Sequence, residues 1–257
     1  MSVHPTAVVH PDARIAEGVE IGAYSVIDEH VSVDAGTHIG HHCVISGHTR
    51  IGCNNRIWSF VSLGSPPQDK KYCGEPTSLE IGDDNTIREF CTFNTGTVHD
   101  VGTTRLGNGN WIMAYVHLAH DCQVGNSTIF ANNSQLAGHV HVGDFAILGG
   151  FTAVHQFVKI GAHSLTAIGT VLLQDLPPFV LASGNPAAAH GINSEGLRRR
   201  GISAHTIESL RRAYKTLYRT GLTLEEAKKA LATPAAETSE VRELLEFLAR
   251  ASRGIVR

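Results

Sequence analysis

Hydrophobic residues recur every six positions along most of this chain. Between Leu106 and Pro177 the sequence divides into hexads whose first place is aliphatic almost throughout and whose fifth place is mostly small. Places five and one lie two residues apart across the hexad boundary, which is the spacing of side chains on one side of a strand. Places two to four hold Gly, Asn, Asp and Ala, which favour corners. The pattern predicts a left-handed parallel β-helix with three flat faces, one turn for every three hexads.

The same phase runs from Val3 to Ser62, with Val or Ile at every first place. It breaks over residues 64–80 (GSPPQDKKYCGEPTSLE), where two consecutive prolines cannot continue a strand ladder, and it resumes at Ile81. Long loops inside compact repeats are usually either functional or disordered, and the hydrogen-bonding side chains of this one favour function. We therefore expect it to be extruded from the β-helix and to contact a polar ligand. A second, shorter break over residues 99–105 shifts the phase by one. The ligand-binding candidates in the first loop are Gln68, Asp69 and Lys71.

The period becomes helical from Asn193 onward, which predicts two domains. We expect a β-helix with its extruded loop over residues 1–192 and an α-helical domain over residues 193–257. Within the second domain, a short helix over residues 194–200 is followed by three longer helices. These three are predicted to begin at Ser203, Thr223 and Ser239.

Composition agrees with a thin solenoid core, because the chain has 26 Gly and only 6% aromatic residues. Three of the five cysteines occupy the inward fifth place, so we expect them to be reduced core thiols: Cys43, Cys91 and Cys122. Residues 145–174 carry a single charge, but their six-residue period and glycines argue against a membrane span. The repeat begins at Val3, so we expect no signal peptide and a soluble, cytoplasmic protein.

Charge is concentrated in one segment of the helical domain. Residues 194–219 hold seven Lys or Arg and two Glu, a net charge of +5 in a chain whose total is −3. Such a segment is either a solvated helix face or a docking surface for an acidic partner or a phosphate. We expect no nucleic-acid partner, because the chain is acidic overall and has no interleaving of basic and aromatic residues.

Sixteen histidines point to a site. The hexads that begin at residues 118, 136 and 154 belong to one face, in successive layers about 4.8 Å apart. His120, His139 and His155 therefore line one edge, with His117 beside them. Three imidazoles can bind Zn²⁺ with an open fourth position. Alternatively, His120 is a general base oriented by Asp121, and a substrate hydroxyl attacks directly, since no Ser or Cys is placed as a nucleophile.

Four stretches together resemble UDP-N-acetylglucosamine acyltransferases, a hexapeptide-repeat family that performs the first step of lipid A biosynthesis. They are HLAHDC (117–122), LAGHVHVGDFAILGGFTAVHQF (136–157), PQDKKYCGEPT (67–77) and NSEGLRRRG (193–201). The resemblance implies a homotrimer with active sites between subunits and no cofactor. It also implies transfer of a 3-hydroxyacyl group from acyl carrier protein to the 3-position of UDP-N-acetylglucosamine.

The resemblance assigns roles residue by residue. It implies a general base at His120, its partner at Asp121 and an oxyanion donor at the Gly138 N–H. Substrate contacts fall at Gln68, Asp69, Lys71, His117, His139, His155 and Gln156. Nucleotide and carrier contacts fall at Asn193, Glu195, Arg199 and Arg200.

Three departures from the family pattern leave details open. Pro186 replaces a His near the nucleotide, and Ile168 replaces a Gly at the position associated with acyl-chain length. GSPP before Gln68 also differs, so the sugar's 3-substituent could be a hydroxyl or an amine.

Two other functions fit the fold. One is a zinc hydratase of the carbonic-anhydrase type that uses His120, His139 and His155. The other is a non-catalytic scaffold, which would leave the histidine edge without a purpose. The helical domain and the extruded loop count against the hydratase, because CO₂ needs neither.

Overall fold

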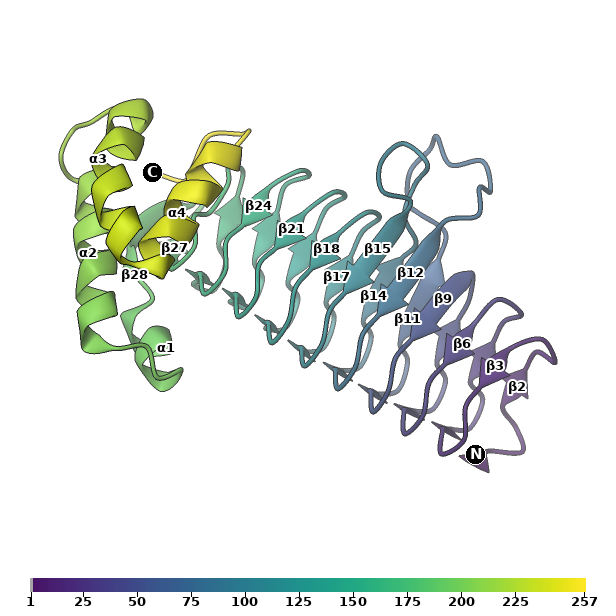
Figure 1. Cartoon of the computed structure of the whole chain (residues 1–257). Helices are drawn as coiled ribbons and strands as arrows, with labels where there is room; N and C mark the ends of the chain where they lie inside the picture. Colours follow the sequence, from purple (N-terminus) through teal and green to yellow (C-terminus); the bar gives the residue numbers. More distant parts are fainter. Residues whose placement is uncertain (1) are drawn as a thin grey trace.

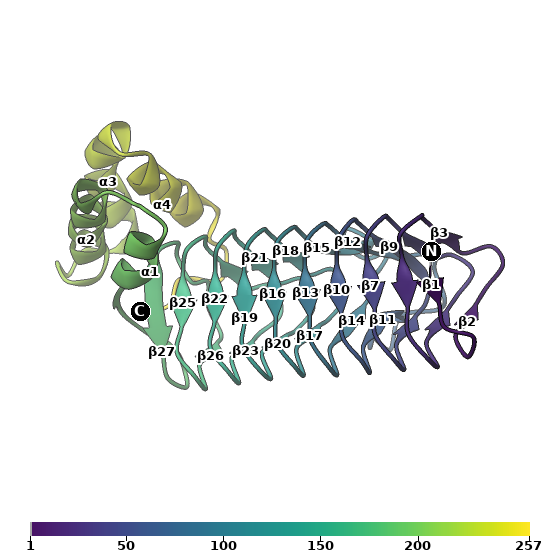
Figure 2. The ribbon, with the colours of Figure 1, turned by 90° about the horizontal axis from the view of Figure 1, so that it is seen from below.

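The computed structural model describes residues 2–257 as an elongated solenoid with helices at its C-terminal end (Figures 1 and 2). Short strands stack into three parallel sheets, which we name A, B and C. From residue 2 to residue 172, successive strands belong to sheets A, B and C in turn, so each turn of the solenoid passes once through every face. The predicted left-handed parallel β-helix with an α-helical C-terminal region is confirmed.

Within residues 2–257, 21 of the 28 strands are two residues long, as expected when a corner interrupts the chain in each hexad. Sheet A consists of β1 (Ser2–Val3), β4 (Glu20–Ile21), β7 (His38–Ile39), β10 (Arg56–Ile57), β13 (Thr86–Ile87), β16 (Trp111–Ile112), β19 (Ile129–Phe130), β22 (Ile147–Leu148), β25 (Leu165–Thr166), β27 (Val180–Ser183) and β28 (Ala188–Ile192). Sheet B consists of β2 (Val8–Val9), β5 (Val26–Ile27), β8 (Val44–Ile45), β11 (Ser62–Ser65), β14 (Thr92–Asn94), β17 (His117–Leu118), β20 (Gln135–Leu136), β23 (Ala153–Val154) and β26 (Val171–Leu172). Sheet C consists of β3 (Arg14–Ile15), β6 (Ser32–Val33), β9 (His48–Ile51), β12 (Ser78–Ile81), β15 (Thr103–Leu106), β18 (Gln123–Val124), β21 (His141–Val142) and β24 (Lys159–Ile160).

The core is a column of first-place side chains from all three faces. Val124 pairs with Val142 and Val142 with Ile160, so equivalent hexad places stack directly on one another. All three side chains are buried. The three fifth-place cysteines are also fully buried with free thiols, as predicted. Burial raises the pKa of Cys91 and of Cys122 to about 12, so these thiols are inert core groups.

Two loops interrupt the solenoid at the same corner, between sheets B and C (Figure 1). The first joins β11 to β12 and the second joins β14 to β15. Strand pairing extends further into both interruptions than the hexad pattern predicted, because β11 continues to Ser65, β12 starts at Ser78 and β15 starts at Thr103. The loops are tied together where they leave the solenoid, since the Thr95 N–H donates to the Ser65 carbonyl at 3.1 Å.

The solenoid ends in an antiparallel hairpin of β27 and β28, and the helices follow. They are α1 (Ser194–Arg199), α2 (Ala204–Tyr218), α3 (Leu224–Glu237) and α4 (Ser239–Arg250). Ser203 and Thr223 accept the expected capping bonds at the N-termini of α2 and α3. The helices enclose a second apolar core that includes Leu210, Leu231 and Leu244. Within residues 2–257, none of the helices combines the length and the apolar character needed to cross a membrane.

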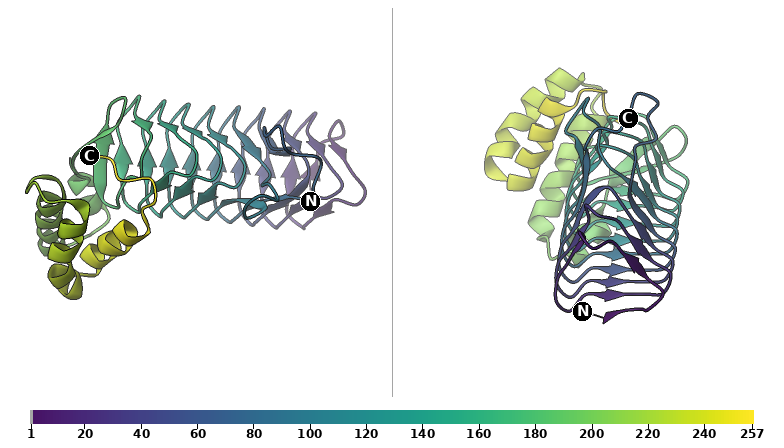
Figure 3. Two further views of the ribbon diagram at one scale, coloured as in Figure 1. Left: turned by 90° about the horizontal axis from the view of Figure 1, so that it is seen from above. Right: turned by 90° about the vertical axis from the view of Figure 1, so that its right-hand side faces the viewer.

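The chain does not stop at α4. After Arg250 it runs back to the last turn of the solenoid, where Ile255 forms a parallel bridge with Asp175 (Figure 3). Ile255 and Val256 are buried there.

Candidate active site

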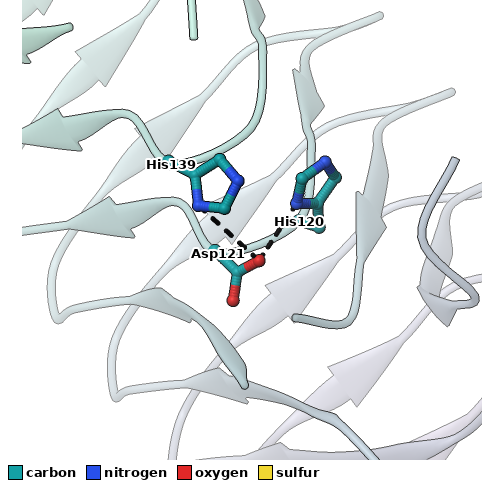
Figure 4. Close-up of side chains that lie close together, drawn as sticks. All are labelled: His120, Asp121 and His139. Carbon is teal, nitrogen blue, oxygen red and sulfur yellow. Dashed lines mark hydrogen bonds and ion pairs between the residues drawn. The ribbon is translucent and has the colours of Figure 1, made fainter. Parts of the chain in front are cut away.

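The corner between sheets B and C brings His120, Asp121 and His139 together (Figure 4). His120 and Asp121 turn the corner after β17, and His139 turns the same corner one layer above. Nδ1 of His120 lies 3.0 Å from Oδ2 of Asp121. A proton on Nδ1 is fixed by this carboxylate, which leaves Nε2 as the acceptor.

Asp121 is fully buried, and the second loop supplies its hydrogen-bond donors. It accepts the Thr97 hydroxyl at 2.7 Å, the Thr97 N–H at 3.0 Å and the Gly102 N–H at 3.1 Å. A buried carboxylate is costly unless it is hydrogen-bonded throughout, and these donors satisfy it. The loop thereby holds Asp121 in the orientation that faces His120.

His139 has a carboxylate partner of its own. Its Nδ1 lies 2.6 Å from Oδ2 of Asp100, on the second loop, and 3.8 Å from Oδ2 of Asp121. Its ring stacks on Phe157 with centroids 4.3 Å apart and meets the His120 ring edge to face. Both imidazoles are largely covered, with 15% of the His120 side chain and 12% of the His139 side chain exposed.

Gly138 forms the wall against which the His120 ring rests. A Cβ atom at this position would lie 2.5 Å from Cε1 and 2.7 Å from Nε2 of His120. The ring can occupy this place only because residue 138 has no side chain. Within residues 2–257 the Gly138 N–H has no hydrogen-bond partner, and the residue is buried beneath the His120 ring.

The first loop closes one side of the corner and forms a cleft with it. Asp69 and Lys71 line a cavity of about 490 Å³ together with Asp100, His139 and Lys159. The Lys71 N–H donates to Oδ1 of Asp69 at 3.0 Å, and this bond is the main reason why the pKa of Asp69 is lowered. Asp69 is thus an anionic hydrogen-bond acceptor facing the cleft. Gln68 is exposed on the same loop.

The other predicted histidines lie around the cluster but do not join it. His117 points outward from sheet B, where its Nδ1 lies 2.8 Å from the Thr92 hydroxyl, and burial lowers its pKa. His155 and Gln156 are exposed one layer above Gly138, and Nδ1 of His155 donates to the Gln156 carbonyl at 3.1 Å. The sequence prediction that His120, His139 and His155 share one edge agrees with this placement, but His155 is not within ligand distance of the other two.

Two predicted residues, Arg200 and Ile168, lie at other corners of the solenoid. Arg200 stacks over Phe145, at the corner between sheets C and A, with its guanidinium carbon 4.2 Å from the ring centroid. Ile168 lies between β25 and β26, at the corner between sheets A and B, and is 76% exposed. A single chain therefore does not bring either residue to His120.

The remaining predicted residues lie on or next to α1. Asn193 is buried and caps this helix, accepting the Gly196 N–H through Oδ1 at 3.1 Å while its amide donates to the His163 carbonyl. Glu195 pairs with Arg199 at 3.2 Å on the exposed surface. Glu195 also pairs with Arg198 at 3.0 Å. Exposed pairs of this kind contribute little to stability, so a ligand can replace them at little cost.

Within residues 2–257, two groups of side chains could hold a metal ion. One is His120, Asp121 and His139, whose ligand atoms lie within 4.8 Å of one another. The carboxylate of this group is already saturated with donors, and both imidazoles direct Nδ1 toward carboxylates. This arrangement is typical of two imidazoles oriented by carboxylates, and it differs from a zinc site formed by three histidines. The other is an exposed group at the N-terminal end, His10, Asp12 and Glu29.

Sequence reasoning missed the residues of the second loop. Thr97 and Asp100 position the carboxylate and the imidazole, yet in the sequence this loop shows only as a slip in hexad phase. A phase change indicates that the chain leaves the regular repeat to form a loop. Polar residues near such a change could therefore have been identified as candidate site residues.

Comparisons with known proteins agree on one family. Residues 175–256 match the model described as UDP-N-acetylglucosamine O-acyltransferase, domain 2, and residues 103–138 match the bacterial transferase hexapeptide model. The chain is 65% identical over 256 residues to the acyl-[acyl-carrier-protein]–UDP-N-acetylglucosamine O-acyltransferase of Thiobacillus denitrificans, covering 100% of this chain and 99% of that one.

Solved structures agree with this result. The enzyme LpxA from Acinetobacter baumannii superposes with a TM-score of 0.96 at 47% identity, covering 99% of each chain. The UDP-N-acetylglucosamine O-acyltransferase of Moraxella catarrhalis superposes with a TM-score of 0.98 at 44% identity, covering 100% of each chain.

Proposed function

The chain belongs to the family of acyl-[acyl-carrier-protein]–UDP-N-acetylglucosamine O-acyltransferases of lipid A biosynthesis, and from this membership we propose a specific reaction and mechanism for it. It transfers a 3-hydroxyacyl group from acyl carrier protein to the 3-position of UDP-N-acetylglucosamine. The observation that carries the mechanism is the buried Asp121 carboxylate bonded to Nδ1 of His120, which leaves Nε2 free beside Gly138.

His120 acts as the general base in this proposal. Nε2 takes the proton from the sugar 3-hydroxyl as the oxygen attacks the thioester carbonyl carbon. The tetrahedral intermediate then collapses, the C–S bond breaks, and the departing thiolate of the carrier takes the proton back from His120. Asp121 stabilises the imidazolium formed between these steps, and such acid–base assistance contributes about 10²- to 10⁴-fold in rate.

The negative charge that develops on the carbonyl oxygen needs a donor. The Gly138 N–H, which has no partner within residues 2–257, is the proposed donor. Asp69 and Lys71 line the cleft next to His139 and are the proposed sugar and phosphate contacts, with Gln68 on the same loop. His117, His155 and Gln156 border the corner and complete the substrate surface.

Arg199, Arg200, Asn193 and Glu195 are assigned to the nucleotide and the carrier, and Ile168 to acyl-chain length. Arg200 and Ile168 lie at corners different from that of His120. We therefore propose that the site is completed by neighbouring subunits of a homotrimer, in which a corner of one chain faces a different corner of the next.

The test is an acyl-transfer assay with purified protein, UDP-N-acetylglucosamine and 3-hydroxyacyl carrier protein, with the product identified by mass spectrometry. Wild type should form the 3-acylated sugar nucleotide, and His120→Ala should lower kcat by about 10²- to 10⁴-fold. His205→Ala, which removes an exposed imidazole from α2, is the matched control and should retain activity. Near-normal turnover by His120→Ala would refute the mechanism. Stoichiometric zinc, with activity lost on chelation, would favour a hydratase instead.

A further inference from the structure

Asp175 is a fully buried carboxylate that has no part in the mechanism above. Its Oδ1 accepts the backbone N–H of Lys159 at 2.8 Å, and its Oδ2 accepts the backbone N–H of Ser252 at 3.1 Å. Its own N–H donates to Gly254, and its carbonyl accepts from Val256. One side chain therefore joins the last turn of the solenoid to the returning C-terminal segment, Arg250 to Val256, which we name the C-terminal strap.

The C-terminal strap also binds the side chain of Lys159. Its Nζ donates to the Arg250 carbonyl at 2.6 Å, at the C-terminus of α4, where a cation is favoured. An ammonium group has three donors, so two remain after this bond. Both ends of Lys159 are thus fixed, its backbone by Asp175 and its ammonium by Arg250.

This anchored lysine lines the cleft next to the catalytic corner. Lys159 and Ser252 lie in the wall of the 490 Å³ cavity that also contains Asp69, Asp100 and His139. Lys159 also lines a second cavity of about 570 Å³ between sheet C and α4, together with Arg250. It therefore lies where the two cavities meet.

The charge balance of the first cleft depends on this residue. Two carboxylates, Asp69 and Asp100, are matched by two ammonium groups, Lys71 and Lys159. His141, next to Lys159 on sheet C, adds no fixed charge at neutral pH, because burial lowers its pKa. Lys159 thus supplies one of the two ammonium groups of this cleft, and its loss would weaken the attraction of the cleft for an anionic substrate.

We propose that Lys159 binds a substrate phosphate at the edge of the active-site cleft, and that Asp175 is the positioning residue that holds it there through the C-terminal strap. This inference rests on the proposed function. Both substrates of that reaction carry phosphate, the sugar nucleotide as a diphosphate and the carrier as the phosphodiester of its prosthetic arm. An ammonium that is already anchored loses little side-chain freedom on binding either one.

The experiment compares Lys159→Met, Lys159→Arg and Asp175→Asn with Lys229→Met, which removes an exposed ammonium from α3. Lys159→Met should raise KM about tenfold for one substrate with kcat nearly unchanged, as expected for loss of one charge-assisted bond. A rise confined to UDP-N-acetylglucosamine assigns the diphosphate, and a rise confined to the acyl carrier assigns its prosthetic arm. Lys159→Arg should remain close to wild type. Asp175→Asn should raise KM for the same substrate and also lower Tm.

If Lys159→Met and Lys229→Met have the same KM for both substrates, the proposal is wrong. If wild type itself shows no acyl transfer, the proposed function fails instead. A second measurement uses only wild-type protein, so it remains informative if a substitution prevents folding. It tests whether bound substrate protects Lys159 from reductive methylation. Saturating substrate should slow methylation of Lys159 but not of Lys229, as measured on peptides by mass spectrometry. Equal labelling rates with and without substrate would also overturn the proposal.

Discussion

Replacement of Gly138 by alanine should displace the His120 imidazole without unfolding the solenoid. The new Cβ atom would lie 2.5, 2.7 and 3.1 Å from three atoms of that ring. The backbone at Gly138 has no positive φ, so alanine fits its conformation. The His120 ring must therefore move, while the Gly138 N–H proposed as oxyanion donor stays in place.

The size of the effect follows from these contacts. Ordinary van der Waals contact begins near 3.4 Å, so the ring must retreat by roughly 1 Å from a neighbour at 2.5 Å. A misplacement of about 1 Å costs on the order of 10²-fold in rate, because the base no longer meets the hydroxyl in line. The same movement strains the bond from Nδ1 of His120 to Asp121. We expect kcat/KM to fall by about 10²-fold or more, with Tm changed by only a few degrees.

The matched control is Gly150→Ala, at another corner of the solenoid. A Cβ atom there would meet the Asn132 carbonyl at 3.4 Å and Cγ1 of Ile168 at 3.8 Å, which are ordinary contacts, and its φ is likewise not positive. Because Ile168 is assigned to acyl-chain length, both variants are assayed with the acyl chain that wild type prefers. Steady-state kinetics and thermal denaturation of both variants measure the difference. If Gly138→Ala is as active as Gly150→Ala, the position of the His120 ring does not control the reaction and the reasoning is refuted.

Three further predictions concern other parts of the chain. Charge reversal in Arg199→Glu should raise KM more for acyl carrier protein than for UDP-N-acetylglucosamine, with an effect that weakens at high salt; equal rises would indicate a nucleotide role. Ile168→Gly should shift preference toward longer acyl chains in a competition assay. Each added methylene that becomes buried should contribute about 0.8 kcal/mol, or roughly fourfold in rate. An unchanged ranking of chain lengths would exclude Ile168 as the determinant of length. Burial lowers the pKa of His117, His141 and His163. As the pH falls, these histidines therefore bind protons in the unfolded chain before they do so in the folded protein. The free energy of unfolding should consequently fall as pH drops below about 6.5. Denaturant unfolding at pH 7.5 and 5.5 measures this difference in the free energy of unfolding. If the His163 imidazole contributes, the difference between the two pH values must be smaller in His163→Phe than in wild type.

The periodic part of the fold could be predicted from the sequence because each hexad place has one environment. Val124, Val142 and Ile160 are inward for the same reason, and their stacking follows from the period. The same arithmetic placed His120 and His139 one layer apart at one corner. Their edge-to-face contact, with ring centroids 4.9 Å apart, is a consequence of that spacing.

The aperiodic part could not be predicted in the same way. Nothing in the hexad pattern indicates that Asp100 reaches His139 or that Thr97 binds Asp121, since both belong to a loop whose path depends on tertiary contacts. The partnership of Asp175 with Ser252, which lie 77 residues apart, depends on where the helical domain returns the chain. Periodicity determines neighbours within the solenoid, but it carries no information about segments that leave it.

Both interruptions of the repeat contribute groups to the candidate site. The donors to the buried Asp121 side chain come from outside the regular repeat. The loop between β14 and β15 supplies the Thr97 hydroxyl together with the Thr97 and Gly102 N–H groups, and thereby makes a charged Asp121 tolerable beneath His120. The loop between β11 and β12 adds Asp69 and Lys71 to the cleft above it. The solenoid fixes the spacing of the imidazoles, and the loops supply the carboxylate and the hydrogen-bond donors around them, as the proposed general base requires.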